Sequence, residues 1–164
     1  MPGGAAFFAL AGLLAVTEIL FYHLTESTLE EALPGLLERS LGRGWHAVVQ
    51  TGSEERRDAL DQHLWTFRDD SFLAHGTDRE PHAAEQPVLL TVGQGNPNAA
   101  SIRFLVDGAE PPPLDAYERA VFIFDGHDQA QLETARRHWK ELKAAGHAVT
   151  YWQQTPDRRW ERKA

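Results

Sequence analysis

The sequence predicts an α/β protein of three layers, in which a mostly parallel sheet carries helices on both faces. Short apolar runs rich in Val, Ile and Phe alternate along the chain with longer segments whose leucines recur at helical spacing. Such alternation favours parallel strands joined by right-handed crossovers. The 164 residues suffice for one compact domain of this kind and are too few for two catalytic domains.

The chain is expected to open with a strand and a helix. Glu18–Leu24 is a short apolar run with Ile, Phe and Tyr, which favours a buried strand. Leucines from 29 to 41 then recur on one helical face, and Thr25 or Ser27 is the expected cap. Pro34 interrupts this pattern, so either the helix begins there or its first turn is separate and kinked.

The middle of the chain is expected to hold a second strand, a second helix and two more strands. His46–Gln50 is the second strand, and Ser53 is the expected cap of a helix that continues to Phe67. Residues 87–92 and 101–106 are apolar enough for two further strands, separated by a turn rich in glycine and asparagine.

The last third is expected to repeat the order of strand, helix and strand. A fifth strand ends at Phe124, and the longest helix runs from Asp128 to about Ala145, with Gly146 as its stop. A last strand is expected at His147–Trp152, followed by a short basic tail.

Residues 1–15 differ from this pattern because they are nearly all apolar. No Lys or Arg precedes the apolar run, and the run is too short to span a bilayer, so neither a signal peptide nor a membrane anchor is favoured. We expect a dispensable extension, with Val16 as a candidate native start through a GTG codon. Residues 16–164 then form the single folded domain.

Composition limits the classes of partner. With 42% hydrophobic and 24% charged residues and no cysteine, the chain has the composition of a cytoplasmic globular protein without disulfides or thiolate metal sites. A net charge of -8 argues against binding nucleic acid mainly through phosphates. Residues 1–127 hold 8 basic and 19 acidic side chains, whereas residues 128–164 hold 8 and 5. A basic surface on an acidic body favours a short acidic partner.

Loops that bind phosphate are missing from the sequence. No G-x-x-x-x-G-K-[ST] motif occurs, and the turn at 25–28 has no glycine to bring a pyrophosphate against the backbone. We therefore expect no nucleotide-binding loop, no cofactor and no metal. Asp125, His127 and Asp128 leave one catalytic alternative, a small nucleotide-dependent hydrolase or transferase, because α/β enzymes place reactive groups where strands end. Capping of the last helix by Asp128 is the structural alternative.

Two aromatic residues flank an acidic turn in an irregular segment. Trp65 and Phe72 lie on either side of Asp69 and Asp70. Aromatic residues in such a segment either fill a core or anchor an interface. The residues alone favour the core.

The last helix and the strand after it combine basic and aromatic side chains. One interpretation is a solvated basic face over a core tryptophan. The other is a pocket that takes an apolar side chain while guanidinium groups bind carboxylates. The sequence alone leaves both interpretations open. The side chains concerned are those of Arg136, Arg137, Trp139, Lys140 and Lys143, with Gly146 and Tyr151 close behind.

Four segments, taken together, resemble the DNA polymerase III chi subunit family over roughly residues 17–154. No single segment is a catalytic signature, and the resemblance lies in their order and spacing. The segments are Phe21–Leu24, the Gly52–Ser53 turn with Leu60–Trp65, Ser71–His75, and Ala135–Gly146.

The resemblance implies a Rossmann-like fold without nucleotide chemistry and a non-catalytic adaptor of the polymerase III holoenzyme. In that family, one surface binds the acidic, phenylalanine-ended tail of single-stranded-DNA-binding protein, and another binds the psi subunit of the clamp-loader complex. The resemblance places the psi-facing surface at Trp65 and Phe72. It places the tail site at Arg136 and Trp139, with Gly146 and Tyr151 nearby.

Two positions of the tail site depart from better-known relatives. Those relatives have Tyr where this chain has Trp139, and a family lysine falls at Leu132. Direct binding of single-stranded DNA is a further alternative, with Trp160 as a stacking platform in the basic tail. The net charge opposes that alternative.

Overall fold

The structure, a computed structural model, describes residues 16–68 and 72–164, so the extension expected at residues 1–15 lies outside the described residues. The helices are α2 (Leu29–Gly42), α3 (Glu54–Thr66) and α4 (Gln129–Ala144), and Ala83–Glu85 forms the 3-10 turn η1. The strands are β1 (Glu18–Leu24), β2 (Ala47–Gln50), β3 (Gly76–Thr77), β4 (Val88–Thr91), β5 (Ile102–Leu105), β6 (Arg119–Asp125), β7 (Val149–Gln154) and β8 (Trp160–Arg162).

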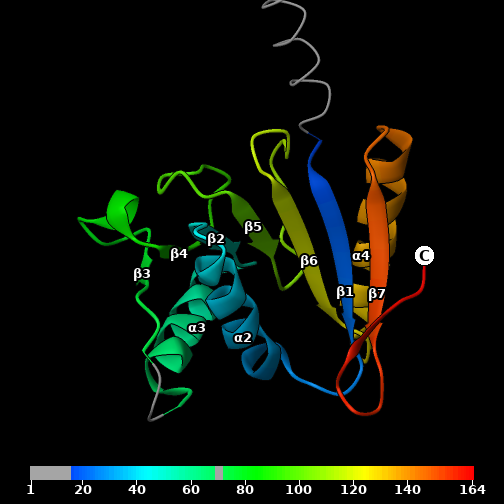
Figure 1. Ribbon diagram of the computed structural model, residues 1–164, viewed down its shortest axis with the longest axis horizontal. Coiled ribbons are helices and arrows are strands. Elements are labelled where there is room, and N and C mark those ends of the chain that lie inside the picture. Colours follow the sequence, from blue (N-terminus) through cyan, green and yellow to red (C-terminus); the bar gives the residue numbers. More distant parts are fainter. Residues whose placement is uncertain (1–15, 69–71) are drawn as a thin grey trace, which may run out of the picture.

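An eight-stranded sheet in the order β3-β4-β2-β5-β6-β1-β7-β8 forms the middle layer. In Figure 1, α2 and α3 lie in front of this sheet and α4 lies behind it. Every neighbouring pair of strands is parallel except β7 and β8. The expected three-layer, mostly parallel α/β fold is therefore confirmed. Among the described residues, no helix has the length and apolar character needed to cross a membrane.

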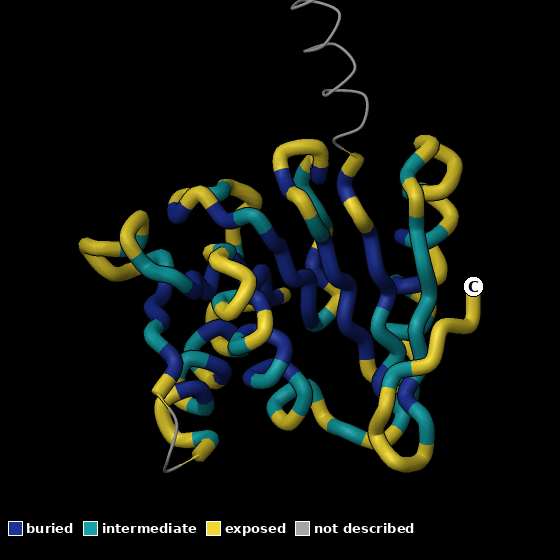
Figure 2. Tube along the Cα trace, in the orientation of Figure 1, coloured by how far each residue is buried: buried dark blue, intermediate teal, exposed yellow. Residues whose placement is uncertain are grey.

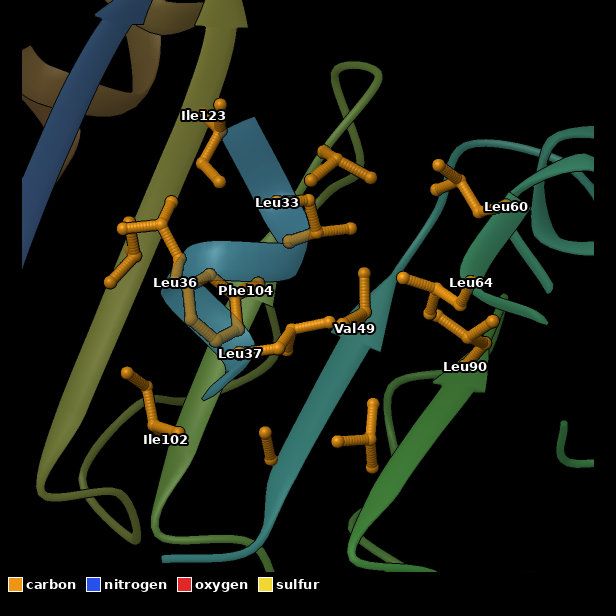
Figure 3. Close-up of a cluster of buried hydrophobic side chains, with 14 of the residues drawn as sticks. Leu33, Leu36, Leu37, Val49, Leu60, Leu64, Leu90, Ile102, Phe104 and Ile123 are labelled. Carbon is orange, nitrogen blue, oxygen red and sulfur yellow. The ribbon is translucent and has the colours of Figure 1, made fainter. Parts of the chain in front are cut away.

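Successive side chains of the central strands point to opposite faces of the sheet, and they pack into two separate cores, one on each face. Because parallel strands are covered on both sides, the central strands are buried along most of their length (Figure 2). Behind the sheet, Phe21 and Phe122 stack with ring centroids 4.6 Å apart. In front, α2 contributes Leu33, Leu36 and Leu37, which lie among Val49, Phe104 and Ile123 (Figure 3).

Helix α2 begins later than the sequence predicts. Thr28, rather than Thr25 or Ser27, is the cap: its side chain accepts from the backbone N–H of Glu31, whose carboxylate accepts from that of Thr28. The cause is a tertiary contact. Gln154 Oε1 accepts the backbone N–H groups of residues 25, 26 and 27 at 3.2, 3.0 and 2.9 Å, which holds that segment outside the helix.

Pro34 lies inside a continuous α2, so both expectations for the proline are wrong. A proline cannot donate to the carbonyl four residues earlier, here that of Glu30. His63 Nε2, on α3, lies 2.7 Å from this carbonyl oxygen and replaces the missing donor. The helix therefore continues through Pro34, because a neighbouring helix satisfies the group that the proline leaves unpaired.

A fully buried arginine ties β5 to three other segments. The Arg103 side chain donates to Gln50 Oε1 through Nε and Nη2, and to the carbonyl oxygens of Gly93 and Gly95. Nη1 also donates to the Tyr117 hydroxyl at 2.8 Å. All five N–H donors of the guanidinium are therefore used, without any carboxylate. Burial lowers the pKa of Arg103, and its contact with Tyr117 opposes that effect.

The tail expected after the last strand is folded as β8, which pairs antiparallel with β7. The Trp160 ring stacks on Tyr22 with centroids 4.4 Å apart and packs on the front core. Arg158 of the connecting turn pairs with Glu31 at 3.4 Å. The ring that the DNA-binding alternative requires as a platform is thus already stacked within the protein.

Candidate protein-binding site

An aromatic cluster connects α4 with the back of the sheet. Trp139 meets Phe21 edge to face with centroids 5.5 Å apart, and meets Tyr151 in the same way at 5.8 Å. Phe21 and Tyr151 are register partners on β1 and β7, which brings both rings under the helix. Trp139 and Tyr151 are only partly buried, so the cluster reaches the surface. Trp139 thus packs on the core, as the first interpretation of the last helix expects, and it is also accessible, as the second requires.

Basic side chains lie in a stripe beside this cluster. Arg136, Lys140 and Lys143 recur at helical spacing, and the Lys143 ammonium lies 5.0 Å from the centroid of the Trp139 ring. The side chains of Arg136 and Lys140 are exposed and make no hydrogen bond or ion pair with any other described residue. Burial raises the pKa of Tyr151, and the Arg136 guanidinium opposes that effect. Arg136 and Trp139 lie three residues apart on α4, so they share a face of the helix.

Two residues expected at this site have other surroundings. Arg137 forms ion pairs with Glu110 and, at 3.4 Å, with Glu141. Gly146 ends α4 with a backbone φ of 90°, and its N–H donates to the carbonyl of Lys143. The structure places Trp139 against Tyr151, with Arg136 and Lys140 exposed on the same helix as Trp139. It places Arg137 in a separate ion pair and gives Gly146 the predicted role of helix stop.

Glu110 should make the stability of α4 depend on acid. Its hydrogen bonds from Arg137 and then His138 lower the pKa of the Glu110 carboxyl from 4.5 to about 2. Because the folded-state pKa is depressed, the stabilisation is present above about pH 4.5 and is lost as the pH falls towards about 2. The difference in free energy of unfolding between wild type and Glu110→Gln, measured with urea at several pH values, should shrink over that range. A constant difference would contradict this assignment.

One neighbour of the cluster was not predicted from the sequence. His23, on β1, has its Nδ1 2.6 Å from the Tyr151 hydroxyl oxygen, and its ring stacks on Phe124 with centroids 4.9 Å apart. Burial lowers the pKa of His23, His127 lowers it further, and Asp125 opposes both. Both residues lie on predicted strands. The sequence alone does not give the register of β1 and β7, however, and that register brings His23 to Tyr151.

Trp65 and Phe72 form a separate apolar surface at the end of α3. Their side chains are 50% and 74% exposed, so the expectation that they fill the core is wrong. Their rings lie 5.9 Å apart, and His75 lies 4.5 Å from the Trp65 ring. Exposed neighbouring aromatic rings are typical of protein interfaces.

The crevice at the carboxyl ends of the strands has the wrong charge for phosphate. Arg56 is its only arginine among the described residues, and that side chain is paired with Glu30 at 2.9 Å and with Asp107 at 3.2 Å. The residues of the catalytic alternative have structural contacts. Asp125 accepts from the backbone of His127, His127 Nε2 contacts the carbonyl of residue 25, and Asp128 caps α4.

Comparisons with known proteins identify the family of this chain. Residues 16–150 match the family described as DNA polymerase III chi subunit, HolC. The chain is 28% identical over 103 residues to a Rickettsia prowazekii protein named "Probable DNA polymerase III subunit chi", covering 63% of this chain and 62% of that protein. It is 34% identical over 59 residues to the DNA polymerase III subunit chi of Pseudomonas aeruginosa, covering 36% and 40%.

The family match covers the Trp65 surface completely and the surface around Trp139 only in part. The family match contains α4 and the Trp65 surface and ends one residue before Tyr151. The chain matches less than two thirds of the length of either relative. Because the family match covers more than half of the chain, the chain belongs to the DNA polymerase III chi subunit family.

Proposed function

We propose that this chain is a non-catalytic adaptor of DNA polymerase III that acts in the cytoplasm and binds the acidic, phenylalanine-ended tail of single-stranded-DNA-binding protein. The tail site is the stripe on α4 with the aromatic cluster beside it. A second surface, around Trp65 and Phe72, binds the psi subunit or another clamp-loader subunit. The two surfaces together link the single-strand coat to the clamp-loading assembly.

One observation carries the proposal: Arg136 and Lys140 are exposed and without ion pairs among the described residues, directly beside the partly exposed Trp139. On a chain of net charge -8, most exposed cations can find a carboxylate. A stripe that has none is suited to carboxylates supplied by a partner. The neighbouring ring offers an apolar surface to the terminal phenylalanine.

The second surface is supported by exposure and by chemistry. Trp65 and Phe72 present apolar rings without a basic stripe of their own, so they suit a packed protein contact rather than an acidic peptide. Trp65 lies on α3 and Phe72 follows that helix, whereas the tail site lies on α4 on the other face of the sheet (Figure 1). The two partners are therefore expected to bind at the same time.

The non-catalytic role is supported by the crevice where related folds hold a nucleotide. Its carboxylates would repel a phosphate, and Arg56 is already paired with two of them. Asp125, His127 and Asp128 each have a structural contact. Saturable ATP binding in calorimetry that disappears in Asp125→Ala would instead favour the hydrolase or transferase alternative.

Arg136→Glu is expected to weaken binding of a labelled tail peptide by about tenfold or more and to flatten the dependence of affinity on salt. The change removes a charge-assisted contact and adds repulsion to an acidic ligand. Fluorescence anisotropy at several salt concentrations measures both effects. Arg159→Glu is the matched control, because it makes the same charge change on the exposed β7–β8 turn. If Arg136→Glu binds as the control does, the tail site lies elsewhere.

A further inference from the structure

A hydrogen bond joins the carboxyl end of β1 to the aromatic cluster on α4. His23 Nδ1 lies 2.6 Å from the Tyr151 hydroxyl oxygen, which is well within hydrogen-bond distance. The Tyr151 ring meets both His23 and Trp139 edge to face, with centroids 5.9 and 5.8 Å apart. His23 therefore contacts the ring that forms one wall of the cluster.

The backbone leaves room for this histidine at one position. A Cβ atom on Gly126 would lie 2.0 Å from His23 Nε2 and 2.5 Å from its Cδ2. Both distances are far shorter than any contact that real atoms make, so a side chain at 126 would displace the imidazole. Glycine at this position and the stacking of His23 on Phe124 at 4.9 Å together fix the ring.

The second nitrogen of the same ring has no hydrogen-bond partner in the part of the chain that the structure describes. Nε2 makes no hydrogen bond to any residue in the ranges 16–68 and 72–164, and His23 is only partly buried. When the Tyr151 hydroxyl donates to Nδ1, the imidazole proton lies on Nε2. An N–H donor on a partly exposed ring then lies beside Tyr151, at the edge of the aromatic cluster.

We propose that His23 is part of the tail site, where it holds the Tyr151 ring through Nδ1 and donates its Nε2–H to a carboxylate of the tail. This inference rests on the proposed function, which identifies the ligand as an acidic peptide. It extends the site from α4 and β7 onto β1.

The surroundings of His23 determine how binding should depend on pH. Burial and His127 lower its pKa, Asp125 opposes them, and Arg136 is the charged group of α4 that acts on Tyr151. Because its pKa is lowered from the ordinary value, His23 is neutral at neutral pH and gains a positive charge only as the pH falls below that value. The carboxylates of the tail stay ionised down to about pH 4. A bound carboxylate favours the charged imidazole, so binding should tighten as the pH falls.

A double-mutant cycle tests the pairing. His23→Leu, Tyr151→Phe and the double variant are compared with wild type by anisotropy of the labelled tail peptide. At about pH 7.5, each single change should weaken binding about three- to tenfold, and the double variant should lose less than the product of the two effects. Wild-type binding should tighten about threefold or more towards about pH 5.5, and His23→Leu should lose that change.

The controls separate the possible failures. His82→Gln removes an exposed histidine beside η1, at the opposite end of the sheet from α4, and should keep the pH dependence. Tyr151→Phe removes only one oxygen, so it tests the pair even if His23→Leu fails to fold. If wild type binds the peptide but both single variants bind equally well, His23 is not in the site. If wild type does not bind at all, the proposed function is wrong.

Discussion

Trp139→Ala should weaken binding of the tail peptide by about 2 kcal/mol or more, which is about 30-fold in the dissociation constant. The ring lies between the basic stripe and the Tyr151 and Phe21 rings, so it is the apolar surface that a terminal phenylalanine would contact. Truncation removes this contact without changing any charge. The slope of affinity against salt should therefore stay close to that of wild type, in contrast to Arg136→Glu.

Trp139 also packs on the back core, so Trp139→Ala could weaken binding by disturbing the fold. A second substitution tests this. Trp139→Phe keeps an aromatic ring over Phe21 and should bind the peptide with an affinity between those of wild type and Trp139→Ala. Thermal unfolding confirms that each variant is folded at the temperature of the assay. A folded Trp139→Ala chain with wild-type affinity would exclude this residue as the anchor.

Arg103→Met should lower the free energy of unfolding by about 3–5 kcal/mol, as expected when a buried polar network loses one partner. The side chain is 0% exposed, and its five donors satisfy Gln50, Tyr117 and two glycine carbonyls. Methionine fills much of the volume and satisfies none of these acceptors. The urea midpoint should fall, with an unchanged slope if the denatured state is unaffected.

Arg79→Met is the matched control for this prediction. Its side chain is 70% exposed and lies 3.7 Å from Asp58, which is a weak surface contact. The change in free energy of unfolding should stay within about 0.5 kcal/mol. Similar values for the two variants would contradict the account of Arg103 as the buried centre of this region.

Much of the fold follows from local pattern. The strand at Glu18–Leu24, the Ser53 cap, the Asp128 cap and the stop at Gly146 were all predicted, because each depends on neighbours in sequence. Apolar spacing also placed Trp139 towards the sheet. The polar face of α4 could also be predicted from spacing, because residues three and four apart share a face of a helix.

The remaining features depend on residues far apart in the chain. Strand β8 is short and charged, and it is defined by pairing with β7 and by Trp160 on Tyr22. The start of α2 is set by Gln154, and the proline inside it is accommodated by His63. No local pattern reports such contacts. Arg103 stood within an apolar run, but its acceptors come from three other segments.

The candidate site shows the same division. Arg136 and Trp139 share one helix and could be predicted as neighbours, whereas Arg137 was expected to join them and instead pairs with Glu110 from another segment. His23 could not be assigned, because its contact with Tyr151 depends on the register of β1 and β7. The exposure of Trp65 and Phe72 likewise depends on how the end of α3 and the segment that follows it pack on the rest of the chain.

Calorimetric titration of the full chain with two acidic peptides tests the central claim most directly. The peptides share every residue except the last, which is phenylalanine in one and alanine in the other. If α4 holds the tail of single-stranded-DNA-binding protein, the phenylalanine peptide should bind saturably and the alanine peptide about 30-fold more weakly or worse. Equal affinity for both peptides, or no saturable binding of the phenylalanine peptide, would contradict the account.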